Sequence, residues 1–100
     1  MIALVTGATS GFGKAIAEKF AANNYSVIIT GRRKELLDNV SASLIKQYAV
    51  KVLSLNFDVR DKKAVDQHLG NLPSEWQGID VLVNNAGLAL GKDYFEEADE

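Results

Sequence analysis

Four short apolar runs, at residues 2–5, 26–30, 52–57 and 79–83, recur at even intervals along the chain. Each run is rich in Val, Ile or Leu. The first, second and fourth do not alternate strictly between apolar and polar positions, which is typical of strands covered on both faces. The pattern therefore predicts four strands.

The segments between these runs carry apolar residues at helical spacing. Asp61 stands where it can cap the third helix, and residues 23–24, Gly31 and Pro73 mark element boundaries. The chain is therefore expected to alternate strand and helix. The repeating apolar positions are Ile16 and Phe20 in the first helix, Leu36, Leu37, Val40, Leu44 and Tyr48 in the second, and Val65, Leu69 and Leu72 in the third.

Strand alternating with helix predicts the α/β class, in the order βαβαβαβ, with parallel strands joined by right-handed crossovers. Such a chain begins a doubly wound parallel sheet, for which we expect the strand order 3-2-1-4. Residues 93–100 have the acidic character of a helix start, and the fourth strand would form a long apolar edge. We therefore expect residues 1–100 to be the N-terminal portion of a longer domain.

Composition and charge limit which binding partners and which cellular location are expected. Apolar residues make up 47% of the chain and charged residues 24%, as in ordinary globular domains. A formal charge of −2 argues against nucleic acid and anionic membranes as partners. The chain has no cysteine, no signal peptide pattern and no membrane-length apolar run, so a soluble, cytoplasmic protein is expected. The sequence contains no cluster of potential metal ligands, so no metal site is expected. His68 and Trp76 are expected to pack or to face solvent.

Glycines at positions 7, 11 and 13 separate the first strand from the first helix. This arrangement directs backbone N–H groups and a helix N-terminus at a bound anion. Gly7 would permit the tight turn, Gly11 would let a diphosphate approach the backbone, and Gly13 would let the helix pack on the strand. Glycines also cluster in such turns without any ligand, so the turn alone leaves both interpretations open.

A nucleoside-triphosphate P-loop is the nearest competing interpretation, because Gly13 and Lys14 resemble its Gly-Lys pair. That loop requires a glycine five positions before Gly13, where Ala8 stands. It also requires a Ser or Thr after the lysine, where Ala15 stands. Two mismatches in so short a motif make the P-loop a poor interpretation.

The segment 6–13, Thr-Gly-Ala-Thr-Ser-Gly-Phe-Gly, resembles the TGxxxGxG cofactor motif of the short-chain dehydrogenase/reductase family. Three further stretches agree in order and spacing: Gly-Arg-Arg at 31–33, Asp-Val-Arg-Asp at 58–61 and Asn-Asn-Ala-Gly at 84–87. All four lie at the carboxyl ends of predicted strands, where ligands bind in open α/β sheets. The resemblance covers essentially the whole chain and implies the start of a Rossmann fold in an oxidoreductase.

Two arginines after the second strand bear on the choice of cofactor. In dinucleotide folds, an acidic residue at this position accepts a hydrogen bond from the 2′-hydroxyl of the adenosine ribose. Arg32 and Arg33 would instead bind a 2′-phosphate through their guanidinium groups, so we predict NADP(H) rather than NAD(H). The competing interpretation is that both arginines only begin a solvent-exposed helix. The same pair argues against a methyltransferase, which normally has an acidic residue there.

The resemblance also implies roles for residues after the third and fourth strands. Asp58 would accept a hydrogen bond from the adenine amine while Val59 packs on the ring; the alternative is that Asp58 only caps the following turn. Asn84 and Asn85 would brace the strands and position the ribose, and the two small residues after them would admit the nicotinamide half. The predicted cofactor-binding residues are Gly7, Ala8, Thr9, Ser10, Gly11, Phe12, Gly13, Arg32, Arg33, Asp58, Val59, Asn85, Ala86 and Gly87.

Hydride transfer in this family depends on a tyrosine, a lysine four residues later and an upstream serine. We predict no catalytic residue within residues 1–100, and we expect the chain taken alone to bind cofactor weakly or not at all and to be inactive. The three tyrosines are followed four residues later by other side chains: Tyr25 by Ile29, Tyr48 by Val52 and Tyr94 by Ala98.

Longer stretches, at residues 72–87 and 84–91, resemble one branch of the family, the bacterial NADP-dependent 3-hydroxy acid dehydrogenases. The resemblance implies reversible NADP-linked oxidation of a small hydroxy acid, such as serine or allo-threonine, by a homotetramer. The alternative is a non-catalytic dinucleotide-binding module or sensor. A serine and a Tyr-x-x-x-Lys motif encoded after Glu100 would favour the enzyme.

Overall fold

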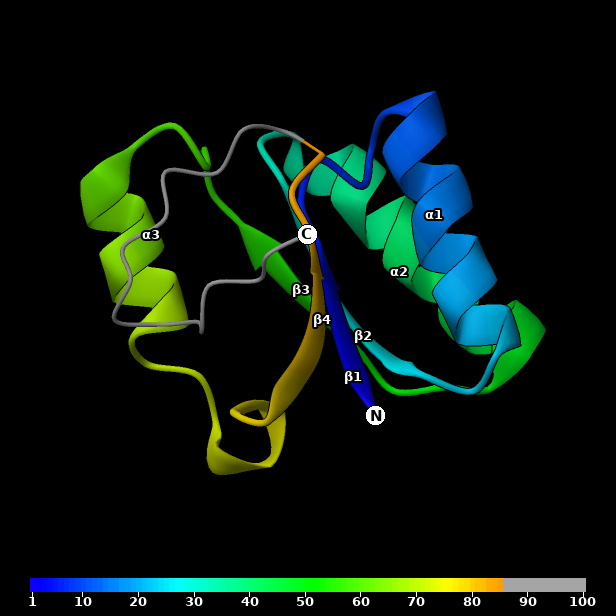
Figure 1. Ribbon diagram of the computed structural model, residues 1–100. Coiled ribbons are helices and arrows are strands. Elements are labelled where there is room, and N and C mark those ends of the chain that lie inside the picture. Colours follow the sequence, from blue (N-terminus) through cyan, green and yellow to red (C-terminus); the bar gives the residue numbers. More distant parts are fainter. Residues whose placement is uncertain (86–100) are drawn as a thin grey trace.

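The computed structural model describes residues 1–85, which form a four-stranded parallel sheet in the order β3-β2-β1-β4 (Figure 1). The predicted α/β class and strand order are therefore confirmed. The elements are β1 (Ile2–Val5), α1 (Gly11–Ala22), β2 (Ser26–Gly31), α2 (Lys34–Tyr48), β3 (Val52–Asn56), α3 (Lys62–Leu69), the 3₁₀ helix η1 (Ser74–Trp76) and β4 (Ile79–Val83).

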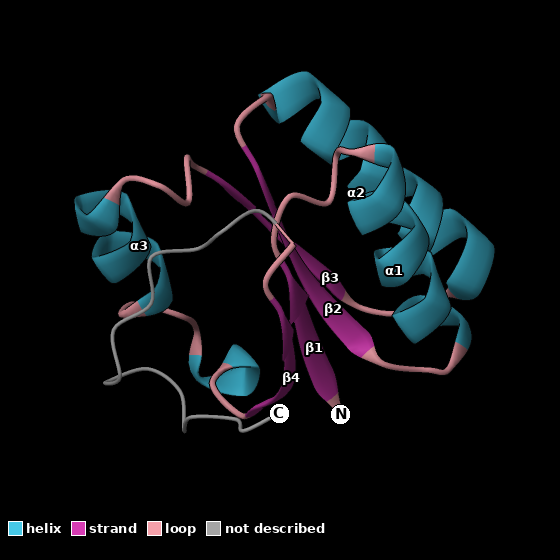
Figure 2. Ribbon diagram, turned by 45° about the horizontal axis from the view of Figure 1, so that its top comes forward, coloured by secondary structure: helices cyan, strands magenta, loops and turns pink. Residues whose placement is uncertain are grey.

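Helices cover both faces of the sheet: α1 and α2 lie on one face, and α3 and η1 lie on the other (Figure 2). Leu4 and Ile28, which pair across β1 and β2, pack in the cluster that contains α3 residue Val65. Their neighbours Val5 and Ile29 pack with α1 and α2 instead. Consecutive apolar residues are needed in β1 and β2 because each face has its own helical layer.

The fourth strand differs from the expectation of burial on both faces. Asp80 of β4 is exposed, and its Oδ2 accepts a hydrogen bond of 2.9 Å from the N–H of Ile2. The four apolar residues of β4 are only half-buried. The physical reason is position, because β4 is an edge strand of the sheet formed by residues 1–85 and pairs there with β1 alone.

The predicted cap of the third helix is confirmed. Asp61 caps α3, where its Oδ1 accepts from the N–H groups of Lys63 at 3.1 Å and Ala64 at 3.4 Å. The helical spacing overestimated the length of α3, because Leu72 lies beyond the last helical residue, Leu69. Leu72 is nevertheless buried, in the same cluster as α3, so it packs as an apolar residue without being helical.

His68 and Trp76 have packing roles, as expected. The His68 ring stacks on Phe57 with a centroid distance of 4.4 Å, and its Nδ1 lies 2.9 Å from the carbonyl oxygen of Ala64. Trp76 is buried in the cluster on the α3 face.

Some predictions fall outside the described residues. These are the cofactor roles of Ala86 and Gly87, the tyrosine at position 94 and the helix start at 93–100. Within residues 1–85, no helix has the length and apolar character needed to cross a bilayer. The same residues bring together no group of three His, Asp or Glu side chains that could hold a metal ion.

Candidate functional site

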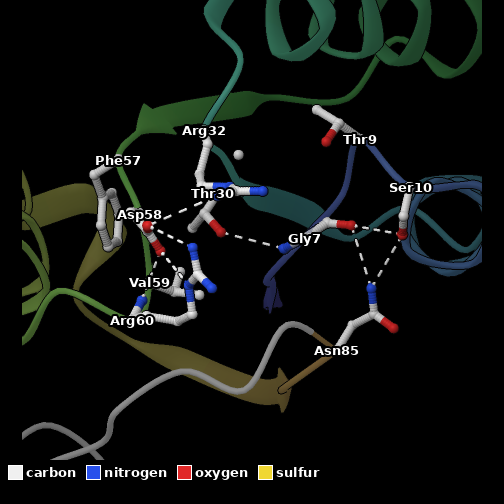
Figure 3. Close-up of a pocket in the computed structure, with 11 residues that line it drawn as sticks. Gly7, Thr9, Ser10, Thr30, Arg32, Phe57, Asp58, Val59, Arg60 and Asn85 are labelled. Carbon is white, nitrogen blue, oxygen red and sulfur yellow. Dashed lines mark hydrogen bonds and ion pairs between the residues drawn. The ribbon is translucent and has the colours of Figure 1, made fainter.

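A pocket of about 460 Å³ opens where the carboxyl ends of the strands meet (Figure 3). Its volume lies in the range of clefts that hold small molecules and cofactors. It brings together the three described strand-end motifs and the glycine turn, although these lie far apart in the sequence. The lining residues are Gly7, Thr9, Ser10, Thr30, Gly31, Arg32, Phe57, Asp58, Val59, Arg60 and Asn85.

The glycine turn begins at Gly7, whose φ of 67° lies in the left-handed region that favours glycine. The N–H of Gly7 donates to Thr30 Oγ1 at 3.3 Å, and the N–H of Ala8 donates to the carbonyl oxygen of Thr30 at 3.0 Å. These bonds tie the turn to the end of β2. Ala8 is fully buried beneath the turn, so it supports the site without lining the pocket.

The carbonyl group of Gly7 joins the turn to the end of β4. Its oxygen accepts hydrogen bonds from Ser10 Oγ at 3.0 Å and from Asn85 Nδ2 at 3.2 Å. Asn85 Nδ2 also lies 3.3 Å from Ser10 Oγ (Figure 3). Ser10 Oγ in turn accepts from the N–H of Gly13 at 3.1 Å and so caps α1. One small network therefore holds β4, the turn and the helix start together.

Gly11 and Gly13 are glycines for different reasons. A Cβ atom at Gly13 would stand 2.2 Å from the carbonyl oxygen of Gly7 and 2.8 Å from Asn85 Nδ2, so packing within the chain excludes a side chain. A Cβ atom at Gly11 would meet nothing within 4 Å, and Gly11 does not have a positive φ. The structure of residues 1–85 thus gives no internal reason for a glycine at position 11, and the backbone there is open to an approaching ligand.

Backbone donors gather at the same place. Among residues 1–85, the N–H groups of Thr9, Gly11 and Phe12 donate to no protein atom. They lie at the N-terminus of α1, a helix of 12 residues with no acidic side chain in its first turn. The partial positive charge of a helix N-terminus and unpaired N–H donors favour an anion. The turn therefore fits a phosphate or diphosphate group.

The structure separates the two arginines predicted to bind the 2′-phosphate. Arg32 lines the pocket, and its Nη1 lies 4.0 Å from Asp58 Oδ2 (Figure 3). Arg33 precedes α2, is exposed and does not line the pocket. Only Arg32 is therefore placed directly at the pocket wall.

Asp58 has the most elaborate contacts in the pocket. Its Oδ1 accepts from the backbone N–H of Arg60 at 2.9 Å and from Arg60 Nε at 3.2 Å, while its Oδ2 accepts from Arg60 Nη2 at 3.2 Å. The side-chain and backbone hydrogen bonds from Arg60 hold the pKa of Asp58 below its ordinary value. Asp58 thus caps the turn after β3, as the alternative interpretation proposed, and also presents its carboxylate to the pocket.

Three further residues with predicted roles, Val59, Phe12 and Asn84, lie in different surroundings. Val59 is buried and lines the pocket, whereas Phe12 projects into solvent with 73% of its surface exposed. Asn84 Oδ1 accepts from Thr6 Oγ1 at 3.4 Å, in agreement with the predicted bracing of strand ends. Arg60 is a pocket residue that the sequence interpretation did not single out, although the Asp-Val-Arg-Asp motif contains it.

The family model described as short chain dehydrogenase matches residues 1–100. The chain belongs to this family. Among curated short chain dehydrogenases, it is 50% identical over 91 residues to NADP-dependent 3-hydroxy acid dehydrogenase YdfG of Salmonella typhi. The match covers 91% of the chain and 35% of that relative, so the chain spans about a third of the length of such relatives.

Solved structures of short chain dehydrogenases have the same arrangement of elements. Serine dehydrogenase from Escherichia coli has a TM-score of 0.78 and 47% identity, over 91% of this chain and 40% of that chain. L-sorbose reductase from Gluconobacter frateurii, complexed with NADPH and L-sorbose, has a TM-score of 0.80 and 36% identity, over 98% and 37% of the two chains.

Proposed function

We propose that this short chain dehydrogenase binds NADP(H) and acts as an oxidoreductase on a 3-hydroxy acid, with residues 1–100 supplying the cofactor-binding portion. The observation that carries the proposal is the pairing of two features in one pocket. The glycine turn offers N–H donors suited to a diphosphate, and Arg32 stands at the end of β2, where a 2′-phosphate would lie.

The chain's own residues would hold the cofactor along the carboxyl edge of the sheet. The N–H groups of Thr9, Gly11 and Phe12 would bind the diphosphate. Asp58 would accept from the adenine amine, and Asn85, which the turn already holds, would orient the ribose on the nicotinamide side. When bound, NADP(H) supplies the hydride acceptor or donor. The other predicted cofactor residues, among them Ala8, Gly13, Arg33, Ala86 and Gly87, complete the proposed set.

Two named relatives support the substrate class. One is an NADP-dependent 3-hydroxy acid dehydrogenase and another is a serine dehydrogenase, and serine is itself a 3-hydroxy acid. The family fold alone supports no particular substrate, as the similarity to L-sorbose reductase illustrates. Serine, allo-threonine and related 3-hydroxy acids are therefore the proposed substrates.

Titration of the full-length protein with NADPH and NADH, followed by cofactor fluorescence, tests the cofactor. We expect NADPH to bind at least tenfold more tightly, a difference of about 1.4 kcal/mol. Reduction of NADP⁺ in the presence of serine or allo-threonine, with lactate as a 2-hydroxy control, tests the substrate. Equal affinity for the two cofactors contradicts the cofactor assignment. Tight NADPH binding without turnover of any 3-hydroxy acid leaves the cofactor assignment standing and refutes the substrate.

Gly11→Ala is expected to separate cofactor binding from stability. The new Cβ atom meets no protein atom, so the free energy of unfolding of the cofactor-free protein should stay the same or rise by about 0.5–1 kcal/mol. The same atom would stand where the diphosphate approaches the backbone, so the Kd for NADPH should rise roughly tenfold or more. Chemical denaturation and fluorescence titration measure the two effects. An unchanged Kd would show that the diphosphate does not approach Gly11.

We further propose that the full-length protein assembles as a homotetramer in the cytoplasm. The resemblance to the 3-hydroxy acid dehydrogenase branch supports the tetramer, and the lack of cysteine in residues 1–100 fits a reducing compartment such as the cytoplasm. Light scattering of the full-length protein measures the number of subunits.

A further inference from the structure

Three charged side chains meet at the end of the pocket formed by β2 and β3. The Oδ2 atom of Asp58 lies 4.0 Å from Arg32 Nη1 and 3.2 Å from Arg60 Nη2, so two guanidinium groups contact one carboxylate (Figure 3). All three line the pocket. The side chains are partly open to solvent, with 62% of Arg32, 36% of Asp58 and 67% of Arg60 exposed. Ligand charges can therefore reach each of them.

The position of Asp58 poses an electrostatic problem for the proposed cofactor. If Arg32 receives the 2′-phosphate of NADP(H), as the proposed function requires, a carboxylate lies only 4.0 Å from the guanidinium that must attract it. An anion at that distance offsets the field of Arg32 and repels the phosphate directly. NAD(H), which carries a neutral 2′-hydroxyl in place of that phosphate, is not repelled in this way.

Arg60 resolves this conflict. It donates to both carboxylate oxygens of Asp58 through its side chain, and its backbone N–H donates to one of them. A guanidinium bound in this two-pronged way is a strong and geometrically fixed partner for a carboxylate. Its contact with Asp58, at 3.2 Å, is closer than the 4.0 Å contact of Arg32. Two cations and one anion leave this end of the pocket with a net positive charge.

We propose that Arg60 is a specificity-determining residue for the 2′-phosphate, because it cancels the charge of Asp58 and leaves the charge of Arg32 available to the cofactor. Asp58 can then accept a hydrogen bond from the adenine amine, which both cofactors have, without repelling the 2′-phosphate, which only NADP(H) has. This inference rests on the proposed binding of NADP(H). A purely structural role for Arg60, in holding the turn after β3, would weaken both cofactors equally.

The test compares the ratio of the Kd for NADH to the Kd for NADPH in variants of the full-length protein at low ionic strength. Arg60→Met keeps a long side chain but removes the charge, and we expect the ratio to fall roughly three- to tenfold. Adding Asp58→Asn to that variant removes the uncompensated carboxylate and should restore most of the ratio, even if both affinities fall. Lys63→Met removes a positive charge from α3 outside the pocket wall and should leave the ratio unchanged.

Each outcome decides for or against the proposal. An unchanged ratio in Arg60→Met overturns it, and so does a ratio that Asp58→Asn fails to restore, since Arg60 would then act on the phosphate directly. If Arg60→Met does not fold, as judged by circular dichroism, Arg60→Gln takes its place, with the same expected fall in the ratio and the same restoration by Asp58→Asn. A lack of NADPH preference in the unmodified protein would instead refute the proposed cofactor, which is a separate result.

Discussion

Arg32→Asp is expected to reverse the cofactor preference and to change the ratio of the NADH and NADPH dissociation constants by roughly 100-fold or more. The substitution removes a charged hydrogen-bond donor from the pocket wall and places a carboxylate where the 2′-phosphate would lie. It also adds a second anion near Asp58, so NADPH should lose far more affinity than NADH. Fluorescence titration of the full-length protein with both cofactors measures the change.

Two further variants make the Arg32 experiment specific. Lys63→Asp changes the charge by the same amount outside the pocket wall and should alter the ratio little. Arg33→Asp tests the prediction that the second arginine also contacts the phosphate, since Arg33 is exposed but does not line the pocket. A ratio that Arg32→Asp leaves unchanged would refute the assignment of this pocket end to a 2′-phosphate.

Gly13→Ala is expected to lower the free energy of unfolding by roughly 2 kcal/mol or more. Alanine in a helix normally gains about 0.5–1 kcal/mol over glycine. Here that gain is outweighed, because the new Cβ atom would stand 2.2 Å from the carbonyl oxygen of Gly7, a backbone atom that the turn holds in place. Relief of the clash requires the turn to move and its hydrogen bonds to Ser10 and Asn85 to lengthen.

Denaturation of the cofactor-free protein measures this effect, and Gly11→Ala is its matched control. The two glycines begin the same helix, yet only Gly13 faces protein atoms within 4 Å. Equal stabilities of the two variants would contradict the packing described for Gly13. We also expect Gly13→Ala to weaken NADPH binding, because the displaced turn is the one that presents the N–H donors.

The central strands could be predicted from the sequence because their apolar residues are consecutive in the chain. Val27, Ile28 and Ile29 are all buried, and a short run of β-branched apolar residues between turn residues is typical of a strand covered on both faces. The prediction was less accurate where burial depends on neighbours. Leu72 follows the helical spacing but lies past the end of α3, and the residues of β4 are less buried than those of β1 because of their place in the sheet. An apolar residue in the sequence predicts burial in the core, but it does not by itself predict whether that residue belongs to a helix, a strand or a loop.

The sequence motifs predicted which strand ends form the site. Gly7, Asp58 and Asn85 come together because the carboxyl ends of parallel strands share one edge of the sheet. Side-chain direction could not be predicted in this way. Arg32 and Arg33 are adjacent in the sequence, yet only Arg32 lines the pocket, and the role of Arg60 depends on a turn that directs its guanidinium back onto Asp58. Such partners are decided by loop geometry rather than by residue type.

The hydrogen bonds that Asn85 makes to the glycine turn also have a consequence for the order of events during synthesis. The two partners, Asn85 and Gly7, are separated by 78 positions in the sequence. Closing so long a loop is entropically costly and comes after local helix formation. The amide of Asn85 can therefore reach the glycine turn only after β4 has been synthesised and has docked on β1. The proposed diphosphate site is then complete only when the fourth strand is in place.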